Sequence, residues 1–345
     1  MRRAKHSREQ VWPLQSGLCF LSFPAPMPKS ADPPLTQPFV FQPIFMERLW
    51  GGRRLETLYD KRIPAGTRVG ESWEIVDRPE AQSVVQNGPL RGLTLHNLWL
   101  EHRKEIFGDV VDAKRFPLLI KILDAQEKLS LQVHPPPSVA ADLGTEAKTE
   151  FWYVTDAADS AEIYVGMKKQ TSRREIEEAL ETGTVKEHLH RISIRAGDAM
   201  FLPSGRLHAI GAGTVIIEIQ QNSDTTYRVF DWDRCDAEGN RRGLHIKEAL
   251  QSINFEDYEP KLVQPEGESL VRHSVFEVEK WTLSKERAVS AGGTLAIVGC
   301  LSGELSCAGV ALKPGEFFLV PANLRDRELR PQADKTSLLR VTIPD

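Results

Sequence analysis

The sequence predicts a mainly β protein, with a barrel-like first domain that carries small helical insertions and a second, smaller β domain. Three observations support this class. Short segments rich in β-branched and aromatic residues recur along the 345-residue chain, as is typical of strands. Segments with helical periodicity are few and short. One turn pattern, Gly-x5-Pro-x-small-x2, occurs twice, in RAGDAMFLPSGRLH at 195–208 and in KPGEFFLVPANLRD at 313–326.

The N-terminal 37 residues differ in composition from the rest of the chain. Residues 1–37 are predicted to be a disordered extension, because PAPMPKSADPPLTQP is proline-rich and has no periodicity. The basic start followed by GLCFLSF weakly resembles a signal peptide, but Glu9 and Gln10 interrupt it and the apolar run is short. Folded structure is expected from Phe39 onward, with one domain at 38–265 and another at 266–345.

Strands of the first domain are predicted from local composition and alternation. An edge strand at 39–44 is interrupted by Pro43, and MERLWGG at 46–52 is predicted to form a turn with a buried Trp50. The remaining strands before residue 222 are predicted at 71–76, 116–123, 151–154, 162–165 and 214–221.

Three helices are predicted between these strands. The first begins at its N-cap Thr94, runs through residue 107 and ends at Gly108. The second spans 172–183 and begins with a Ser-x-x-Glu capping box. A third, shorter helix is predicted at 244–253.

Two polar side chains on the apolar strand around LSLQVH indicate a metal site. Gln132 and His134 are two residues apart, so they point to the same face of a strand. A carboxylate follows at Glu150, directly before the strand-like FWYV. A histidine on a strand is more often structural when it stands alone, so the metal interpretation depends on a further ligand.

That further ligand is His208, which closes the pattern Gly-x5-Pro-x-Gly-x2-His at 197–208. This order resembles the second motif of the cupin barrels, which implies a cupin, or jelly-roll, β-barrel with His208 facing its interior. Two imidazoles, a carboxylate and an amide oxygen can bind one divalent ion. The mixed nitrogen and oxygen ligands, without cysteine, favour an open catalytic site over a closed structural one.

The second copy of the turn pattern lacks these ligands. Asp326 stands where His208 stands in the first copy, and no Gln-x-His or His-x-His pair precedes it. The C-terminal part is therefore predicted to be a degenerate cupin-like domain without metal ligands, the alternative being an unrelated β module. Its strands are predicted at 275–282, 294–298, 316–320 and 337–343.

Composition narrows the possible partners and the compartment. The net charge of −4 gives no support for binding to nucleic acid or to a membrane surface, and no apolar run is long enough for a membrane helix. The four cysteines are scattered, which favours a reducing, cytoplasmic location. We expect a monomer or homodimer with a small-molecule substrate.

Several separate motifs resemble the short bacterial form of type I mannose-6-phosphate isomerase. They are GESWEI, FPLLIKILDA, QVHP, KTE, LPSGRLHAIGAG and QQNSDTTYRVFDWDR, in the order found in the family. The resemblance implies interconversion of D-mannose 6-phosphate and D-fructose 6-phosphate through a cis-enediol. It also implies one zinc ion per chain, bound by Gln132, His134, Glu150 and His208, and it places Arg228 on the catalytic arginine of the family.

The chain departs from the family pattern at two places near the site. Pro136 and Pro137 follow QVHP where the family usually has acidic residues, and Arg206-Leu207 replace the Thr-Ile that often precedes the last metal histidine. Neither change removes a ligand. With these two changes, the sequence does not determine the shape of the loops near the site or how the substrate fits them.

The general base is not determined by the sequence. Lys148 lies two residues before Glu150, so it should share the same face and lie near a bound cation that lowers its pKa. Glu218, within the apolar strand TVIIEIQQ, and Glu71 are the other candidates. Lys148 ranks above Glu218 as the base. The ranking is weak because Lys148 could instead bind phosphate. Glu218 could also be paired with a core arginine.

Cationic and hydroxyl side chains are the candidates for binding the substrate. Ser130, Lys148 and Arg228 are expected to contact it, and Arg206 and Lys247 are further candidates for the phosphate. Arg228 should lie on an extended strand, with Tyr227 and Val229 facing the other way. A structural alternative makes Arg228 an ion-pair partner of Asp224 or Asp231.

Two other function classes remain open. A metal-dependent cupin oxygenase would prefer iron and usually a His-x-His pair, and Gln132 argues against it. A non-enzymatic sugar-phosphate-binding or regulatory module would not need the arginine at position 228.

Overall fold

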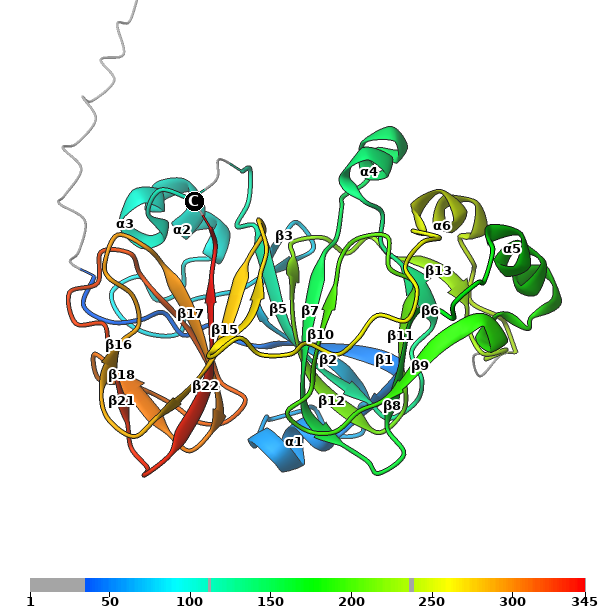
Figure 1. Cartoon of the computed structure of the whole chain (residues 1–345). Helices are drawn as coiled ribbons and strands as arrows, with labels where there is room; N and C mark the ends of the chain where they lie inside the picture. The colour runs from blue at the N-terminus through cyan, green and yellow to red at the C-terminus, as the bar shows by residue number, and fades with distance from the viewer. Residues whose placement is uncertain (1–34, 111–112, 236–238, 345) are drawn as a thin grey trace, which may run out of the picture. The chain divides into compact units, whose positions relative to one another are not determined.

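The computed structural model describes residues 35–110, 113–235 and 239–344, which belong to one compact unit (Figure 1). The predicted fold class is confirmed: the chain is mainly β, and its strands form several antiparallel sheets, none of them closed. The predicted extension at 1–37 lies outside the described residues except for 35–37.

Two sheets form the part of the molecule that carries the site. The larger has the order β1-β2-β5-β12-β7-β10 and the smaller the order β13-β6-β11-β8-β9. Apolar side chains from both, among them Leu123, Trp152 and Ile210, pack into one core, so the two sheets face each other. The strands are β1 (Ile44–Gly52), β2 (Val69–Ile75), β5 (Leu118–Ala125), β6 (Leu131–Val133), β7 (Glu150–Ala157), β8 (Glu162–Met167), β9 (Leu189–Ser193), β10 (Ala199–Leu202), β11 (His208–Ile210), β12 (Thr214–Gln221) and β13 (Tyr227–Phe230).

The turn predicted at 46–52 is wrong, because this segment belongs to β1. Its start pairs with β2, with Ile44 opposite Trp73 and Met46 opposite Glu71, and Trp50 is buried as predicted. A Cβ atom on Gly51 would collide with the backbone of Gly70. The Gly-Gly pair thus allows close contact between backbones, whereas its sequence is also typical of a turn. Only isolated bridges occur in the predicted edge strand at 39–44 before β1 begins.

The helices lie between strands and agree with the prediction in part. The helix predicted from Thr94 breaks at His102 into two, because His102 leaves helical geometry with φ −126° and ψ 29°. Thr94 makes the expected N-cap, and the helix at 172–183 has its capping box. Helices α1 and α4 were not predicted. The helical segments are α1 (Arg54–Tyr59), α2 (Leu95–Glu101), α3 (Arg103–Phe107), α4 (Pro137–Leu143), α5 (Arg173–Thr182), the 3-10 helix η1 (Val185–His188) and α6 (Ile246–Ser252).

The C-terminal sheets repeat part of the first arrangement. The order β15-β22-β17-β20 matches β5-β12-β7-β10 in the first part. The turns that precede β10 and β20 are also alike: Gly197 and Gly315 both have positive φ, and the residue after each accepts a hydrogen bond from the backbone three residues earlier. These strands are β14 (Ser269–Arg272), β15 (Glu277–Leu283), β16 (Arg287–Ala288), β17 (Ala296–Ser302), β18 (Leu305–Cys307), β19 (Val310–Leu312), β20 (Phe317–Val320), β21 (Glu328–Pro331) and β22 (Thr336–Thr342), and the two-stranded sheet β3 (Asp77–Arg78) and β4 (Ala81–Gln82) completes the fold.

The boundary between 265 and 266 stays a prediction. One apolar core contains side chains from both sides of it, such as Phe151 and Ile297. Asp326, at the position of the lost histidine, is exposed and pairs with Arg330 at 3.1 Å.

The environments of three cysteines lead to a testable difference in reactivity. Cys300 and Cys307 are buried, and burial raises the pKa of each thiol to about 12, whereas Cys235 is exposed. The thiolate is the nucleophile. We therefore expect a folded Cys19→Ser variant to react with a thiol reagent at neutral pH only at Cys235. The other two should react only after unfolding. Rapid native reaction of either would contradict their placement.

Candidate metal centre and active-site cavity

Two facing sheets bring the four predicted ligands together. In the smaller sheet, Gln132 on β6 lies opposite His208 on β11, and His134 directly follows β6. In the larger sheet, Glu150 is the first residue of β7 and lies opposite Gln220 on β12. The amide and imidazoles therefore come from one sheet and the carboxylate from the other.

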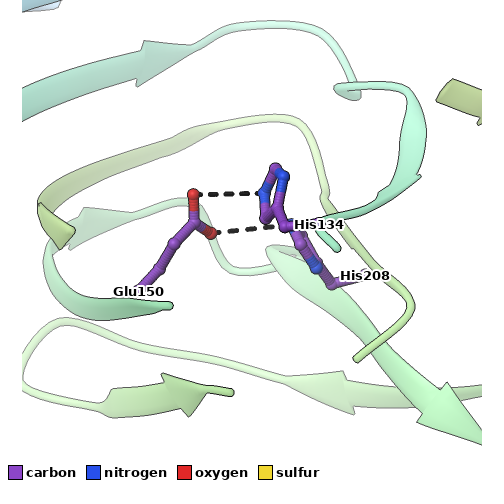
Figure 2. Close-up of side chains that lie close together, drawn as sticks. All are labelled: His134, Glu150 and His208. Carbon is purple, nitrogen blue, oxygen red and sulfur yellow. Dashed lines mark ion pairs between the residues drawn. The ribbon is translucent and has the colours of Figure 1, made fainter. Parts of the chain in front are cut away.

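Three of these side chains converge in the interior. The Nε2 atom of His134 lies 3.2 Å from Oε1 of Glu150, and Nε2 of His208 lies 3.6 Å from Oε2 of the same carboxylate (Figure 2). One ligand atom from each of the three lies within 4.8 Å of the others. All three side chains are buried, Glu150 completely. This is a spacing at which one ion can contact all three.

Backbone carbonyls fix which imidazole nitrogens face the centre. Nδ1 of His134 lies 2.8 Å from the carbonyl oxygen of Thr225, and Nδ1 of His208 lies 2.9 Å from that of Arg206. A carbonyl only accepts hydrogen bonds, so Nδ1 carries the proton in each neutral ring. Each Nε2 then directs a lone pair at the centre, the arrangement usual for metal-binding histidines.

The polar atoms of the cluster indicate a cation site. Nε2 of His134 and Oε2 of Glu150 are buried without a hydrogen-bond partner, and Oε1 of Glu150 contacts the ammonium of Lys148. Buried polar atoms without partners are costly and uncommon. The amide nitrogen of Gln132 lies 3.3 Å from Nε2 of His208, and turning the amide over would bring its oxygen to the same place. The four side chains therefore fit a divalent ion.

The pKa values keep the ligands in their metal-binding forms. Burial lowers the pKa of His208 to about 3 and also lowers that of His134, so both rings are neutral near pH 7. Burial alone would raise the pKa of Glu150, but the ammonium of Lys148 and the nearby imidazoles outweigh it and hold this pKa well below its usual range.

A cavity of about 410 Å³ opens next to the cluster. Gln132 and Lys148 lie in its wall, in front of the three buried ligands, and Ser130 lines it as predicted. Its charged wall is uneven, with five cations and three carboxylates. They are Arg48, Lys121, Lys148, Arg228, Arg242, Glu71, Glu218 and Asp224.

The lysine and glutamate candidates occupy different environments. The Nζ atom of Lys148 lies 2.7 Å from Oε1 of Glu150. Burial lowers the pKa of Lys148, but the carboxylates of Glu150 and Glu218 outweigh burial and raise it. Among the chain's own groups, the expected lowering is therefore reversed.

Glu218 has fewer hydrogen-bond and ion-pair partners than Glu71, the other carboxylate candidate for the base. It accepts a hydrogen bond of 2.9 Å from the Trp152 indole and lies 3.4 Å from Nζ of Lys121, so its predicted core partner is a lysine and not an arginine. Burial, reinforced by Glu150, raises its pKa. Glu71, in contrast, is held by two hydrogen bonds from Arg48 and one from Trp73.

Arg228 lies on β13 beside the metal ligands, opposite Gln132. Its Nη1 atom donates to the carbonyl of Gly243 at 2.9 Å, and its side chain reaches the cavity. Within the described residues no carboxylate pairs with it, and Asp231 binds Arg234 and Arg242 instead. The structural alternative, an ion pair with Asp224 or Asp231, is therefore wrong.

Two phosphate candidates lie away from the cavity. Arg206 makes two hydrogen bonds of 2.8 Å to Asp257, and Lys247 on α6 does not line the cavity wall. The prediction missed Arg48, Lys121 and Arg242. Lys121 could have been found, because it and Glu218 are charged residues inside two apolar strands, and such residues are costly unless they are paired.

Among the described residues, no helix combines the length and apolar character needed to cross a bilayer.

Known proteins of one family are similar to this chain over most of its length. Residues 39–166 match the family model described as phosphomannose isomerase type I, catalytic domain. Mannose-6-phosphate isomerase ManA of Bacillus subtilis (strain 168) is 38% identical over 316 residues, which cover 87% of this chain and 98% of that protein. The probable mannose-6-phosphate isomerase GmuF of the same organism is 39% identical, covering 84% and 95%. A crystal structure of the mannose 6-phosphate isomerase from Bacillus subtilis superposes with a TM-score of 0.79 at 34% identity, covering 88% of this chain and 99% of that chain.

Proposed function

Since this chain belongs to the type I phosphomannose isomerase family, we propose that it interconverts D-mannose 6-phosphate and D-fructose 6-phosphate through a cis-enediol at one zinc ion. The proposed zinc ligands are Gln132, His134, Glu150 and His208. The observation that carries the zinc proposal is the convergence of buried ligand atoms from His134, Glu150 and His208 next to a polar cavity, with Nε2 of His134 and Oε2 of Glu150 lacking a hydrogen-bond partner.

The reaction moves a proton between C1 and C2 of the open-chain sugar. When bound, a divalent ion supplies positive charge for the oxygen that becomes negative, an effect worth several kcal/mol. Arg228, which stays protonated and lies opposite Gln132, orients the oxygens on C1 and C2 and adds fixed positive charge. Burial of the cluster keeps water away from these charges and so strengthens their effect.

The proton itself must pass through a side chain of the cavity wall. Lys148 and Glu218 both line the cavity. The ammonium of Lys148 is already paired with Glu150, so we favour Glu218 as the base that takes the proton from carbon. Lys148 then provides a cation near the sugar oxygens. This reverses the ranking expected from the sequence.

Chelation of the purified enzyme tests this function. Removing zinc should lower turnover, followed in a coupled assay for fructose 6-phosphate, by at least about 10³-fold, because several kcal/mol of stabilisation are lost. Adding back zinc should restore it. Unchanged turnover after complete zinc removal would contradict the mechanism.

The same assay separates the alternatives. An oxygenase would consume dioxygen with iron and form no fructose 6-phosphate. A binding module would retain the sugar phosphate without turnover.

We further propose a cytoplasmic enzyme whose C-terminal part is a degenerate copy of the barrel. The free thiols of Cys235, Cys300 and Cys307 agree with a reducing compartment. The equivalent sheet orders and turns support the internal repeat.

A further inference from the structure

Two arginines of the cavity wall, Arg228 and Arg242, lie near Asp231 and Arg234, which line the neighbouring pocket. Arg234 and Arg242 both bind Asp231, each with a nitrogen-to-oxygen distance of 2.5 Å. Arg228 lines the same cavity wall as Arg242. One carboxylate thus serves a cluster of three guanidinium groups, which leaves an excess of two positive charges.

Arg228 and Arg242 bring positive charge of this cluster to the cavity wall, whereas the wall carboxylate Asp224 acts on Lys148. The other cations of the wall each have a carboxylate partner: Arg48 binds Glu71, Lys121 binds Glu218 and Lys148 binds Glu150. Arg228 has none within the part of the chain that the structure describes, and its Nε is buried without a hydrogen-bond partner. A desolvated cation without a counter-charge is costly. A bound anion would remove that cost.

The hydrogen bonds of Arg242 leave part of its guanidinium available. Its Nε and Nη2 atoms donate to the two oxygens of Asp231. Its Nη1 atom makes no hydrogen bond to another described residue, and the side chain lines the cavity. Asp231 therefore holds Arg242 in place from one side, and the opposite edge can donate to a ligand. A guanidinium held in this way suits phosphate, which accepts two parallel hydrogen bonds.

Within the cluster, Arg228 lies beside the metal ligands and Asp231 lies farther from them along the chain. Arg228 is opposite Gln132, and from there the chain runs antiparallel to β6 and away from the ligands. The Trp232 indole donates to the carbonyl of Leu129, so Asp231 and its neighbours lie beside the residues that precede β6. The strand register shifts between Arg228 and Phe230, so the three residues from Arg228 to Asp231 span less than the roughly 10 Å of a fully extended strand. The Arg242 guanidinium, held by Asp231, thus lies farther along the chain from the metal ligands than Arg228 does.

We propose that Arg242 binds the phosphate of the substrate while C1 and C2 lie at the metal ligands. The inference rests on the proposed function, because it requires a hexose 6-phosphate with its reacting carbons at the opposite end. A phosphate monoester carries nearly two negative charges at neutral pH, which matches the excess of two positive charges in the cluster. Arg228 lies between the two ends, and Arg206 and Lys247 take no part.

Substitution of Arg242 tests this role, with the adjacent arginine as a matched control. In Arg242→Ala, KM for mannose 6-phosphate should rise roughly 10- to 100-fold, the effect of losing a charged hydrogen bond, with a much smaller change in kcat. Competitive inhibition by inorganic phosphate should weaken in parallel. Arg241→Ala should behave as the wild type, because Arg241 pairs with Asp233 on the surface and does not line this cavity.

A second substitution separates phosphate binding from a structural role. If Arg242 only neutralises Asp231, adding Asp231→Asn to Arg242→Ala should restore KM. If Arg242 binds phosphate, KM should stay high in the double variant. Should Arg242→Ala fail to fold, Arg242→Lys replaces it, and KM should still rise because lysine lacks the guanidinium edge. An unchanged KM in the folded variant, or recovery in the double variant, overturns the proposal. Failure of the wild type to isomerise the sugar would instead refute the proposed function.

Discussion

Replacing His208 by alanine is expected to abolish stoichiometric zinc binding and to lower kcat/KM by at least about 10³-fold, since the ion supplies several kcal/mol to the reaction. His208 is buried, and its Nδ1 hydrogen bond to the Arg206 carbonyl aims Nε2 at Glu150. No other imidazole among the described residues lies close enough to replace it. Zinc content by elemental analysis and turnover by the coupled assay measure the two effects.

His190→Ala provides the control for this experiment. His190 is half-buried on β9, in the same sheet, and contacts none of the ligands. It should keep both zinc and activity. His208→Asn, which leaves a smaller cavity than alanine, guards against loss of folding. If His208→Ala folds with its zinc and its turnover intact, the ligand assignment is wrong.

Replacing Arg228 by alanine is expected to lower kcat by about 10²- to 10³-fold, the usual effect of removing one group that stabilises an oxyanion. Zinc content should not change, because Arg228 is opposite the ligand Gln132 but is not itself a ligand. Lysine should restore little, because it lacks the planar fork. The effect should fall on kcat, in contrast to Arg242→Ala, where it falls on KM.

Two measurements make the Arg228 experiment decisive. Exchange of the substrate C2 hydrogen with solvent should slow in parallel with kcat, because both require the same proton transfer. Arg191→Ala, which removes an exposed arginine that pairs with Glu162, should leave kcat unchanged. An Arg228→Ala enzyme with normal kcat would show that the guanidinium does not act in the reaction.

The faces on which the proposed ligands lie were predictable because they depend on local spacing. The alternation of a strand determines that Gln132 and His134 share a face, and the Gly-Pro-Gly turn determines where His208 begins β11. Glu218 was also recognisable, since a carboxylate among isoleucines requires partners. The sequence could not identify Lys121 as that partner without the register of β5 against β12.

The features that sequence analysis missed depend on tertiary contacts. The glycines at 51 and 52 have the composition of a turn, but close approach of β1 to β2 explains Gly51. Arg206 precedes the metal histidine, but its side chain turns away to Asp257. Burial lowers the pKa of Lys148, but Glu150, two residues along the chain, and Glu218 on β12 together raise it, and the contribution of Glu218 could be recognised only from the fold. Local sequence patterns were therefore enough to predict the proposed ligands. The ion pairs of the cavity wall could be recognised only in the folded structure.

The central claim is that four side chains from two facing sheets bind one zinc ion in the active enzyme. Anomalous diffraction at the zinc edge, on crystals of protein with measured turnover, tests it most directly. We predict one peak per chain, within about 2.0–2.2 Å of Nε2 of His134, Nε2 of His208 and a Glu150 oxygen, with Gln132 beside it. A fully active enzyme with no anomalous peak at this position would contradict the account.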